Sequence, residues 1–544
     1  MYEQPRLNPA SPWQWILVTL IVAGVGFRCA NLDLKPYSHD EAYTSLRAVG
    51  QTRLDFDDRW LQNRVATVAD LRNYQTIQPG STTADTVRSL YLEDAQHPPL
   101  YFLLTRGWMQ LFGDSVTATR SLAVLFSLLA LPLMYVLGVE IFANPLAGWL
   151  AMVAFALGPF DIHFAQTARQ YSLVTGTILL SSIFLLRAVR TRQWGHWFGY
   201  VATATIALYT HPFFILNAIA HGAYCFLLGL FGINHPQTPL AARRNQLRVG
   251  GTGLFVSSAW QPFWQYFRAM LAVTLLYGPW LWVVYQRRAQ VAVTTSWAHV
   301  DTTWLHRLER WVFSFTVPTF DLDLFADPLG IYIVGLPTLG LLILAFWLTI
   351  RKTHPTTWLF LLATALVPLL VLLAPDLLRG GIRSVIPRYL LGCFPAVWLA
   401  LGFWMSVGLS QGSRSWKSLV ALVLVGSVVS NAIGVTASTW WSKDVSYDNA
   451  AIIEQLNAAK APTLVSDIGA EYTNSGDLWA LSHSLDDDVS FLLLSTSPDI
   501  SALERDRPAF AFRPSARVRE ALETHNWQLD PLIEDNELYS LQPS

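Results

Sequence analysis

Charged residues are scarce in this chain. Asp, Glu, Lys and Arg together make up 14% of its 544 residues, whereas soluble globular proteins carry about 25%. Hydrophobic residues make up 52%, and apolar runs long enough to cross a bilayer recur along the sequence. The shortage of charge therefore argues against a soluble protein and predicts an all-α polytopic membrane fold.

Cysteine is also rare. Cys29, Cys225 and Cys393 all lie in apolar segments, which indicates small core residues rather than a disulfide framework. The formal net charge of -1 argues against a nucleic acid as partner. The chain has no HExxH sequence and no GxSxG beside a membrane edge, so a protease is a weak explanation. The N-terminal MYEQPRLNPASPWQW has one arginine and no small-residue cleavage site, which indicates an uncleaved anchor.

About eleven apolar segments are predicted to cross the membrane. Basic residues cluster after the fourth, sixth, eighth and tenth of them. Because cationic loops stay cytoplasmic, we expect an integral plasma-membrane protein with a cytoplasmic N-terminus and an extracytoplasmic C-terminus. The segments are residues 13–31, 119–141, 145–163, 171–189, 196–212, 213–233, 269–287, 330–350, 357–375, 387–408 and 417–437. The basic residues are Arg187, Arg190, Arg192, Arg243, Arg244, Arg248, Arg351, Lys352, Arg414 and Lys417.

One short stretch decides this orientation. Pro98 to Phe112 is apolar, but it contains Arg106 and is shorter than the span of about twenty residues that a bilayer requires. Counting it as a crossing would reverse every later loop and put the basic clusters outside. We therefore expect a helix on the outer surface, with a short true span as the alternative.

The same pattern divides the chain into two domains. Residues 1–438 are expected to form the membrane domain, with long outer loops at 32–118 and 288–329. Residues 439–544 alternate helix-like and strand-like segments, which predicts a small extracytoplasmic α/β domain. Its run Asp486 to Asp488 is more typical of a solvated turn than of a metal site. We expect this domain to be structural or to present the acceptor.

The motif Ser38-His39-Asp40-Glu41-Ala42-Tyr43-Thr44 follows the first apolar segment. It places two carboxylates where a membrane helix surfaces, and a catalytic base is useful there if one substrate is a lipid. The alternative is a helix start, in which Ser38 or Asp40 caps and Glu41 favours the first turn.

Four further motifs are predicted at outer membrane edges. Arg169 suits a phosphate, because a guanidinium is a planar bidentate donor, although Arg and Tyr also commonly anchor span ends. Prolines beside His97 and His211 are equally consistent with ordinary helix ends. Arg379, Arg383 and Arg388 make this side unexpectedly cationic, which favours an anionic partner. The motifs are Gln96-His97-Pro98-Pro99-Leu100-Tyr101, Asp161-Ile162-His163 with Arg169-Gln170-Tyr171, Tyr209-Thr210-His211-Pro212, and Pro387-Arg388-Tyr389-Leu390.

In this order, SHDEAYT, QHPPLYFLL, FAQTARQYSL, LYTHPFF and PRYLLGCFP resemble the GT-C membrane glycosyltransferases. The likeness is to the branch of the protein O-mannosyltransferases and the lipid A aminoarabinose transferase, over about residues 13–410. It implies a polyprenyl-phosphate-linked sugar as donor. The family's proposed base, the aspartate of an Asp-Glu pair in the first outer loop, maps onto Asp40. The α/β tail departs from the protein mannosyltransferases, which leaves a lipid, glycan or protein acceptor open.

The resemblance and the residues together predict a mechanism. Asp40 would take the proton of the acceptor hydroxyl, and arginines would stabilise the departing phosphate, so one displacement would invert the sugar. The predicted roles are catalytic for Asp40 and Glu41, donor-phosphate binding for Arg169, Tyr171, Arg388 and Tyr389, and substrate binding for His97, Tyr101, Asp161 and His211.

Two questions stay open in the sequence. Asp40, Asp161 and His163 have the ligand types for a divalent metal, but phosphate recognition by arginines makes a metal unnecessary. A lipid or glycolipid transporter or flippase is the alternative function. Such proteins put charge in mid-span and often contain internal repeats, and no convincing repeat is seen here.

Overall fold

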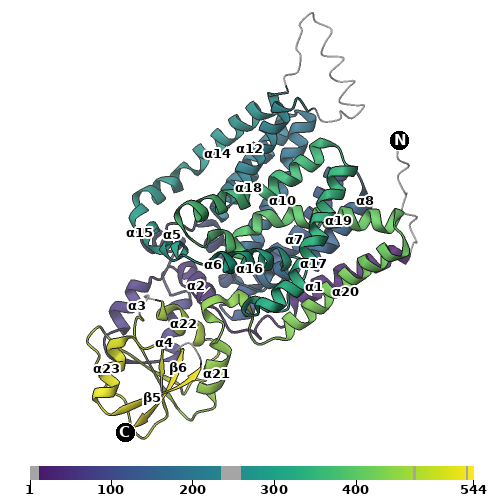
Figure 1. Ribbon diagram of the computed structural model, residues 1–544. Helices are drawn as coiled ribbons and strands as arrows, with labels where there is room; N and C mark the ends of the chain where they lie inside the picture. The colour runs from purple at the N-terminus through teal and green to yellow at the C-terminus, as the bar shows by residue number, and fades with distance from the viewer. Residues whose placement is uncertain (1–11, 234–258, 470–472, 534–536) are drawn as a thin grey trace, which may run out of the picture.

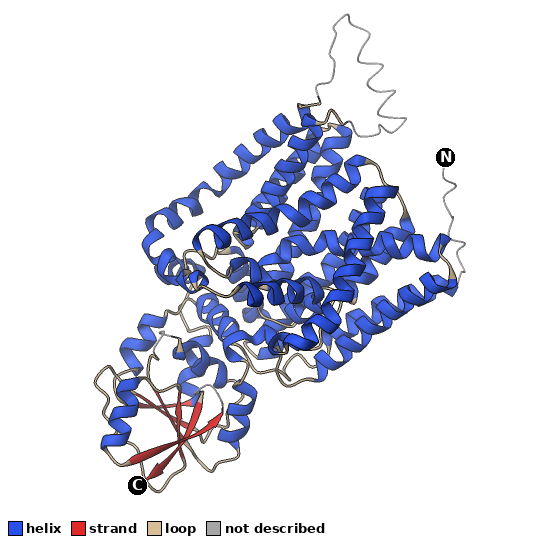
Figure 2. Ribbon diagram, in the orientation of Figure 1, coloured by secondary structure: helices blue, strands red, loops and turns tan. Residues whose placement is uncertain are grey.

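The computed structural model describes residues 12–233, 259–469, 473–533 and 537–544. Long helices form a bundle, and a small α/β domain lies at one end of it (Figure 1). Within the described residues, every strand belongs to that small domain, whereas the bundle is helical (Figure 2). A helical membrane protein with a small α/β domain is therefore confirmed.

Each apolar segment expected to cross the membrane forms helix over most of its length. Among the described residues, seven helices are long and apolar enough to cross, or eight if α8 and α9 count as one bent span. The count of about eleven thus stays a prediction, and the predicted cluster Arg243, Arg244 and Arg248 lies outside the described residues. The helices of the bundle are α1 (Pro12–Cys29), α7 (Val116–Phe142), α8 (Pro145–Ala156), α9 (Pro159–Ala165), α10 (Tyr171–Thr191), α11 (Trp194–Thr210), α12 (Phe214–Leu230), α14 (Gln261–Gln286), α17 (Pro328–Lys352), α18 (Pro355–Arg379), α19 (Phe394–Gln411) and α20 (Arg414–Thr436).

A bend of 57° separates α8 from α9. Pro159 opens α9 and has no N–H to donate, so carbonyls at the end of α8 lose their helical partners. Arg28 of α1 is fully buried and replaces those donors, with one bond of 3.0 Å to the carbonyl of Phe155 and another to that of Ala156. A buried arginine of α1 therefore stabilises the break between α8 and α9.

The first long loop folds into short elements beside the α/β domain. They are α2 (His39–Val49), α3 (Arg53–Trp60), β1 (Arg64–Thr67), α4 (Val68–Arg72), α5 (Thr83–Glu93) and α6 (Leu100–Phe112). The second long loop contains α15 (Arg288–Thr294) and α16 (Trp304–Thr316).

Helix α6 covers the stretch Pro98 to Phe112. It has 13 residues, it packs on α2, α5 and α7, and it is not among the helices that meet the length for a span. Arg106 is buried and donates to the carbonyls of Val49 (3.1 Å) and Ser81 (2.7 Å). The charge that made this stretch a poor span therefore holds the end of α2.

The C-terminal domain is a six-stranded sheet in the order β1-β3-β2-β4-β6-β5. Strands β3, β2 and β4 are parallel, and β6 and β5 extend the sheet antiparallel. The predicted strand-like and helix-like segments match these elements, except β5, which was not expected. The elements are β2 (Thr463–Ser466), β3 (Ser490–Leu493), β4 (Ala509–Phe512), β5 (Trp527–Ile533), β6 (Leu538–Pro543), α21 (Asn449–Asn457), α22 (Asn474–Leu481) and α23 (Ala516–Thr524).

The sheet also contains a strand from the first long loop. Strand β1 pairs antiparallel with β3, with Val65 opposite Leu492. The domain is thus built from two distant parts of the chain, and the predicted boundary at residue 439 misses one of them. Four residues are too few to show a clear strand pattern in the sequence.

Helix α22 packs directly on α2. A Cβ at Gly476 would lie 2.4 Å from Nδ1 of His39, so only glycine permits this approach. The backbone N–H of His39 donates to Ser446 Oγ (2.8 Å), and that hydroxyl donates to the buried carboxylate of Asp477 (2.5 Å). The α/β domain therefore fixes the first turn of α2.

Candidate functional site

Helix α2 begins with a capping box. Ser38 is the N-cap, and its N–H and hydroxyl both donate to Glu41 Oε2 at 3.0 Å. Such a box satisfies donors at the first turn that have no helical partner. The helix-start interpretation of the motif is thus confirmed for Ser38 and Glu41, while Asp40 lies between them with its side chain free of the cap.

Glu41 is fully buried, and both of its oxygens accept hydrogen bonds. Arg120 of α7 donates to them at 2.7 and 2.8 Å, Lys443 at 2.9 Å, and the N–H of Ala168 at 2.8 Å. Burial raises the pKa of Glu41, but the charges of Arg120 and Lys443 outweigh burial and hold it well below its usual range. We call Ser38, Glu41, Arg120, Ala168 and Lys443 the Glu41 network.

This network changes the expected role of Glu41. A carboxylate whose lone pairs are all occupied cannot also accept a proton from a substrate. Glu41 instead connects α2, α7, the turn before Arg169 and the segment after α20. The catalytic role predicted for Glu41 therefore becomes one of positioning.

Asp40 has a different environment. Its side chain is 40% exposed, and Arg388 approaches Oδ2 at 3.8 Å. Arg169 donates to the carbonyl of Asp40 (3.3 Å) and to Thr44 Oγ1 (3.2 Å). Burial raises the pKa of Asp40, but Arg169 and then Arg388 outweigh it and hold the pKa well below its usual range. Asp40 is therefore a partly exposed carboxylate with a lowered pKa, next to Arg388 and on a residue whose backbone carbonyl accepts from Arg169.

His97 joins this group from the loop before α6. Its Nδ1 lies 2.8 Å from Asp94 Oδ1, and its Nε2 lies 3.5 Å from a guanidinium nitrogen of Arg169. The ring of His211 lies 6.1 Å from that of His97 and 6.1 Å from that of Tyr171. The residues Asp40, His97, Arg169 and Arg388 thus come together from four separate parts of the chain. We call Asp40, His97, Arg169 and Arg388 the Asp40 site.

Tyr389 and Tyr101 lie at different distances from this site. Tyr389 follows Arg388 and packs its ring on Phe213 (4.5 Å) and Trp297 (6.1 Å), so it lines the same region. Tyr101 is fully buried and packs on Phe102. We therefore see no surface of Tyr101 that a substrate could reach.

Asp161 and His163 belong to another group. Both are buried in α9. His163 stacks on Trp440 at 5.0 Å, and its Nε2 lies 3.6 Å from Asp321. Among the described residues, no three His, Cys, Asp or Glu side chains are grouped so that they could hold a metal ion. The structure therefore does not bring Asp40, Asp161 and His163 together as ligands: His163 contacts Trp440 and Asp321, whereas Asp40 lies beside Arg388.

Asp444 and Trp297 were not expected at the site. Asp444 lies in η6 (Trp441–Ser446), and its Oδ2 is 2.9 Å from Arg388. The Arg388 guanidinium also lies over the Trp297 ring, 5.9 Å from its centroid. Both residues lie in short 3₁₀ helices, Trp297 in η2 (Ser296–His299) and Asp444 in η6, far along the chain from the motifs that they meet.

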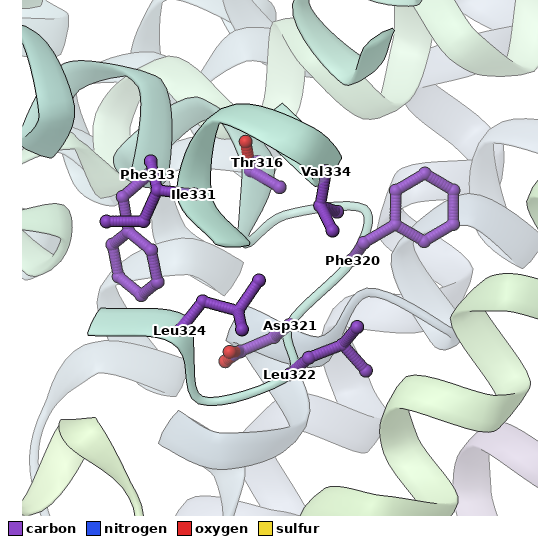
Figure 3. A pocket seen from close by; sticks show the side chains of 8 residues that line it. All are labelled: Phe313, Thr316, Phe320, Asp321, Leu322, Leu324, Ile331 and Val334. Atoms are coloured by element: carbon purple, nitrogen blue, oxygen red, sulfur yellow. The ribbon is translucent and has the colours of Figure 1, made fainter. Parts of the chain in front are cut away.

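A pocket lies elsewhere, between α16 and α17 (Figure 3). Most of its lining side chains are apolar. Asp321 reaches its edge, where burial raises the pKa to about 6. No residue of the Asp40 site lines it. The lining residues are Phe313, Thr316, Phe320, Asp321, Leu322, Leu324, Ile331 and Val334.

Comparisons with known proteins agree with the fold. Residues 96–242 match the family described as dolichyl-phosphate-mannose-protein mannosyltransferase. Two structures of ArnT from Cupriavidus metallidurans, in the apo state and bound to undecaprenyl phosphate, each match with a TM-score of 0.50 and 13% identity, over 98% of both chains. An oligosaccharyltransferase from Archaeoglobus fulgidus has a TM-score of 0.44 and 11% identity, over 90% of this chain and 65% of its own. No curated protein sequence matches.

The family match covers the stretch that contains His97, Arg169, Tyr171 and His211. The ArnT likeness covers nearly the whole chain, including the α/β domain. In sequence over residues 96–242 and in fold over almost its full length, this integral membrane protein resembles the GT-C membrane glycosyltransferases of the protein mannosyltransferase and ArnT branch.

Proposed function

We propose that this protein transfers a sugar from a polyprenyl-phosphate donor to an acceptor hydroxyl, with Asp40 as the general base. The observation that carries the proposal is a partly exposed carboxylate, Asp40, whose pKa Arg169 and Arg388 lower, with Arg388 3.8 Å from its Oδ2 and Arg169 bonded to its backbone carbonyl. A base and an anion-binding pair at one place are what such a transfer needs. ArnT has been solved with undecaprenyl phosphate bound, which supports the same class of donor here.

In the proposed reaction, the acceptor oxygen attacks the anomeric carbon while its proton passes to Asp40. The bond between that carbon and the phosphate oxygen breaks, and polyprenyl phosphate leaves. Arg169 and Arg388 stabilise the charge on the leaving phosphate. Nε of Arg169 is buried and has no hydrogen-bond partner among the described residues, so it offers a further donor. Tyr171 and Tyr389 would line the phosphate position, and His97 and His211 the sugar or acceptor.

We propose that the product is inverted. Retention needs a second carboxylate about 5 Å from the first, free to act as nucleophile. Both oxygens of Glu41 already accept hydrogen bonds within its network, and Asp161 is buried in α9. Asp444 is the other exposed carboxylate beside Arg388. The anomeric configuration of the product therefore tests the mechanism, and a retained anomer would assign a nucleophile to this pair.

The orientation follows from the charge pattern of the loops. We propose that the Asp40 site and the α/β domain lie on the extracytoplasmic side of the plasma membrane, where the donor's tail remains in the bilayer. The acceptor would be a lipid, glycan or protein reached from the aqueous side. We propose no metal step, since arginines already neutralise the phosphate, and transfer is expected to continue in the presence of EDTA.

The test is incubation of the purified protein in lipid with a panel of polyprenyl-phosphate sugars and candidate acceptors. Release of polyprenyl phosphate, dependent on acceptor and lost in Asp40→Asn, is the expected result. Release that is unchanged in Asp40→Asn would remove Asp40 as the base. Movement of intact donor between the two leaflets without release would support the flippase alternative.

A further inference from the structure

The short segment that joins the bundle to the α/β domain is held at both ends. This segment, η6 (Trp441–Ser446), follows α20. The indole N–H of Trp441 donates to Asp321 at 2.6 Å, and Ser446 donates to Asp477 at 2.5 Å. Between them, Lys443 pairs with Glu41 at 2.9 Å. We call this segment the strap.

The strap has an unusual backbone in its middle. Asp444 has φ 54° and ψ -123°, a conformation that residues with a Cβ rarely adopt. Such a conformation costs energy and persists where the surroundings enforce it, which is often at functional sites. The anchors at Lys443 and Ser446 supply that enforcement here.

The strained residue directs its carboxylate at the proposed phosphate site. Oδ2 of Asp444 lies 2.9 Å from Arg388, while the Asp444 side chain is 55% exposed. Asp40 is a second carboxylate on the same guanidinium, at 3.8 Å. A carboxylate and a phosphate bind a guanidinium through the same planar pair of N–H donors. Asp444 and a lipid phosphate would therefore compete for Arg388.

We propose that Asp444 is a built-in anion that occupies Arg388 until the donor binds and returns after transfer to displace the polyprenyl phosphate. This inference rests on the proposed function. It assigns Asp444 a role in setting the affinity for the lipid phosphate and in releasing the product. The strain at Asp444 keeps the competing carboxylate beside the guanidinium and free of other described partners.

The strap also links this exchange to the α/β domain. Val445 accepts a hydrogen bond from Arg513 (2.6 Å), whose other nitrogen pairs with Asp477 (2.6 Å). Both neighbours of Asp444 are thus bound, Lys443 to Glu41 of α2 and Val445 to Arg513 of the α/β domain. When Asp444 moves away from Arg388, the strap transmits this movement to the α/β domain. That domain holds the first turn of α2.

The test measures direct binding of undecaprenyl phosphate to the full-length protein in nanodiscs. Asp444→Asn keeps the shape of the side chain and removes its charge, so we expect binding to tighten by about tenfold. Asp486→Asn, which removes an equal charge from an exposed position of the α/β domain, serves as the matched control and should bind as the wild type does.

Each outcome decides between the proposals. Unchanged or weaker binding by Asp444→Asn, with normal binding by the wild type, overturns the role of Asp444 and leaves the proposed function intact. No binding by the wild type or either variant overturns the proposed function as well. If Asp444→Asn does not fold, Asp444→Gly removes the same carboxylate while suiting the positive φ, and it must show the same tightening.

Discussion

Asp40 and Glu41 are chemically similar neighbours with opposite surroundings. The Asp40 site leaves its carboxylate 40% exposed, with Arg388 3.8 Å from Oδ2. The Glu41 network buries its carboxylate completely and occupies both oxygens. A carboxylate can react where it is open, and it can fix the backbone where it is saturated. On the proposed function, one helix turn therefore carries both the general base and the residue that positions it.

The largest expected effect comes from removing the open carboxylate. Asp40→Asn should lower kcat by about 10²- to 10⁴-fold, the usual range for a positioned general base. Thermal stability should change little, because the Asp40 side chain is 40% exposed and lies outside the cap. Turnover measured as released polyprenyl phosphate checks this. A variant with nearly normal kcat would mean that the two neighbours do not differ in function as we propose.

Removing the buried carboxylate should affect the fold first. Glu41→Gln leaves Arg120 and Lys443 buried without their counter-charge, which should cost about 3 kcal/mol of stability. The measurement is the unfolding midpoint in detergent, compared with Asp40→Asn as the matched control. If Glu41→Gln were as stable as wild type yet inactive, Glu41 rather than Asp40 would be the reacting group.

Arg169 lies between the Glu41 network and the Asp40 site, because it follows Ala168 of the network and contacts Asp40. Arg169→Ala should weaken undecaprenyl phosphate binding by about 10- to 100-fold, because a charge-assisted pair of donors is lost. Arg169→Lys keeps the charge without the planar fork and should lie between. Equal binding by all three proteins would remove Arg169 from the phosphate site.

The smallest expected effect is on pH dependence. The arginines hold the pKa of Asp40 below its usual range, so Asp40 stays a base at lower pH than a free carboxylate would. Arg388→Gln should raise that pKa and move the acid limb of kcat to higher pH by about one unit. Arg383→Gln, whose arginine pairs with Asp376, is the control and should leave the limb in place.

Sequence patterns singled out the residues of the Asp40 site more readily than the contacts that hold those residues in place. The motifs around Asp40, His97, Arg169, His211 and Arg388 could be found because each is polar at the end of an apolar run. The structure brings His97, Arg169 and Arg388 beside Asp40, with the His211 ring 6.1 Å from that of His97.

The supporting contacts could not be found in the same way. Arg120 looks like part of an ordinary span end, and Lys443 and Asp444 lie in an irregular segment about 400 positions from α2 along the chain. Strand β1 is four residues long and joins a sheet built from the other end of the chain. Pairings of such high sequence separation leave no local pattern.

The sequence by itself determined the membrane class, the helical segments, the α/β tail and the short helix Leu100–Phe112, because apolar length and charge position act locally along the chain. The tertiary structure decided which of two adjacent carboxylates is open and which is enclosed. It also decided that Asp161 and His163 turn away and that Asp444 turns toward Arg388. Burial and hydrogen-bond saturation arise from parts of the chain that meet only after folding.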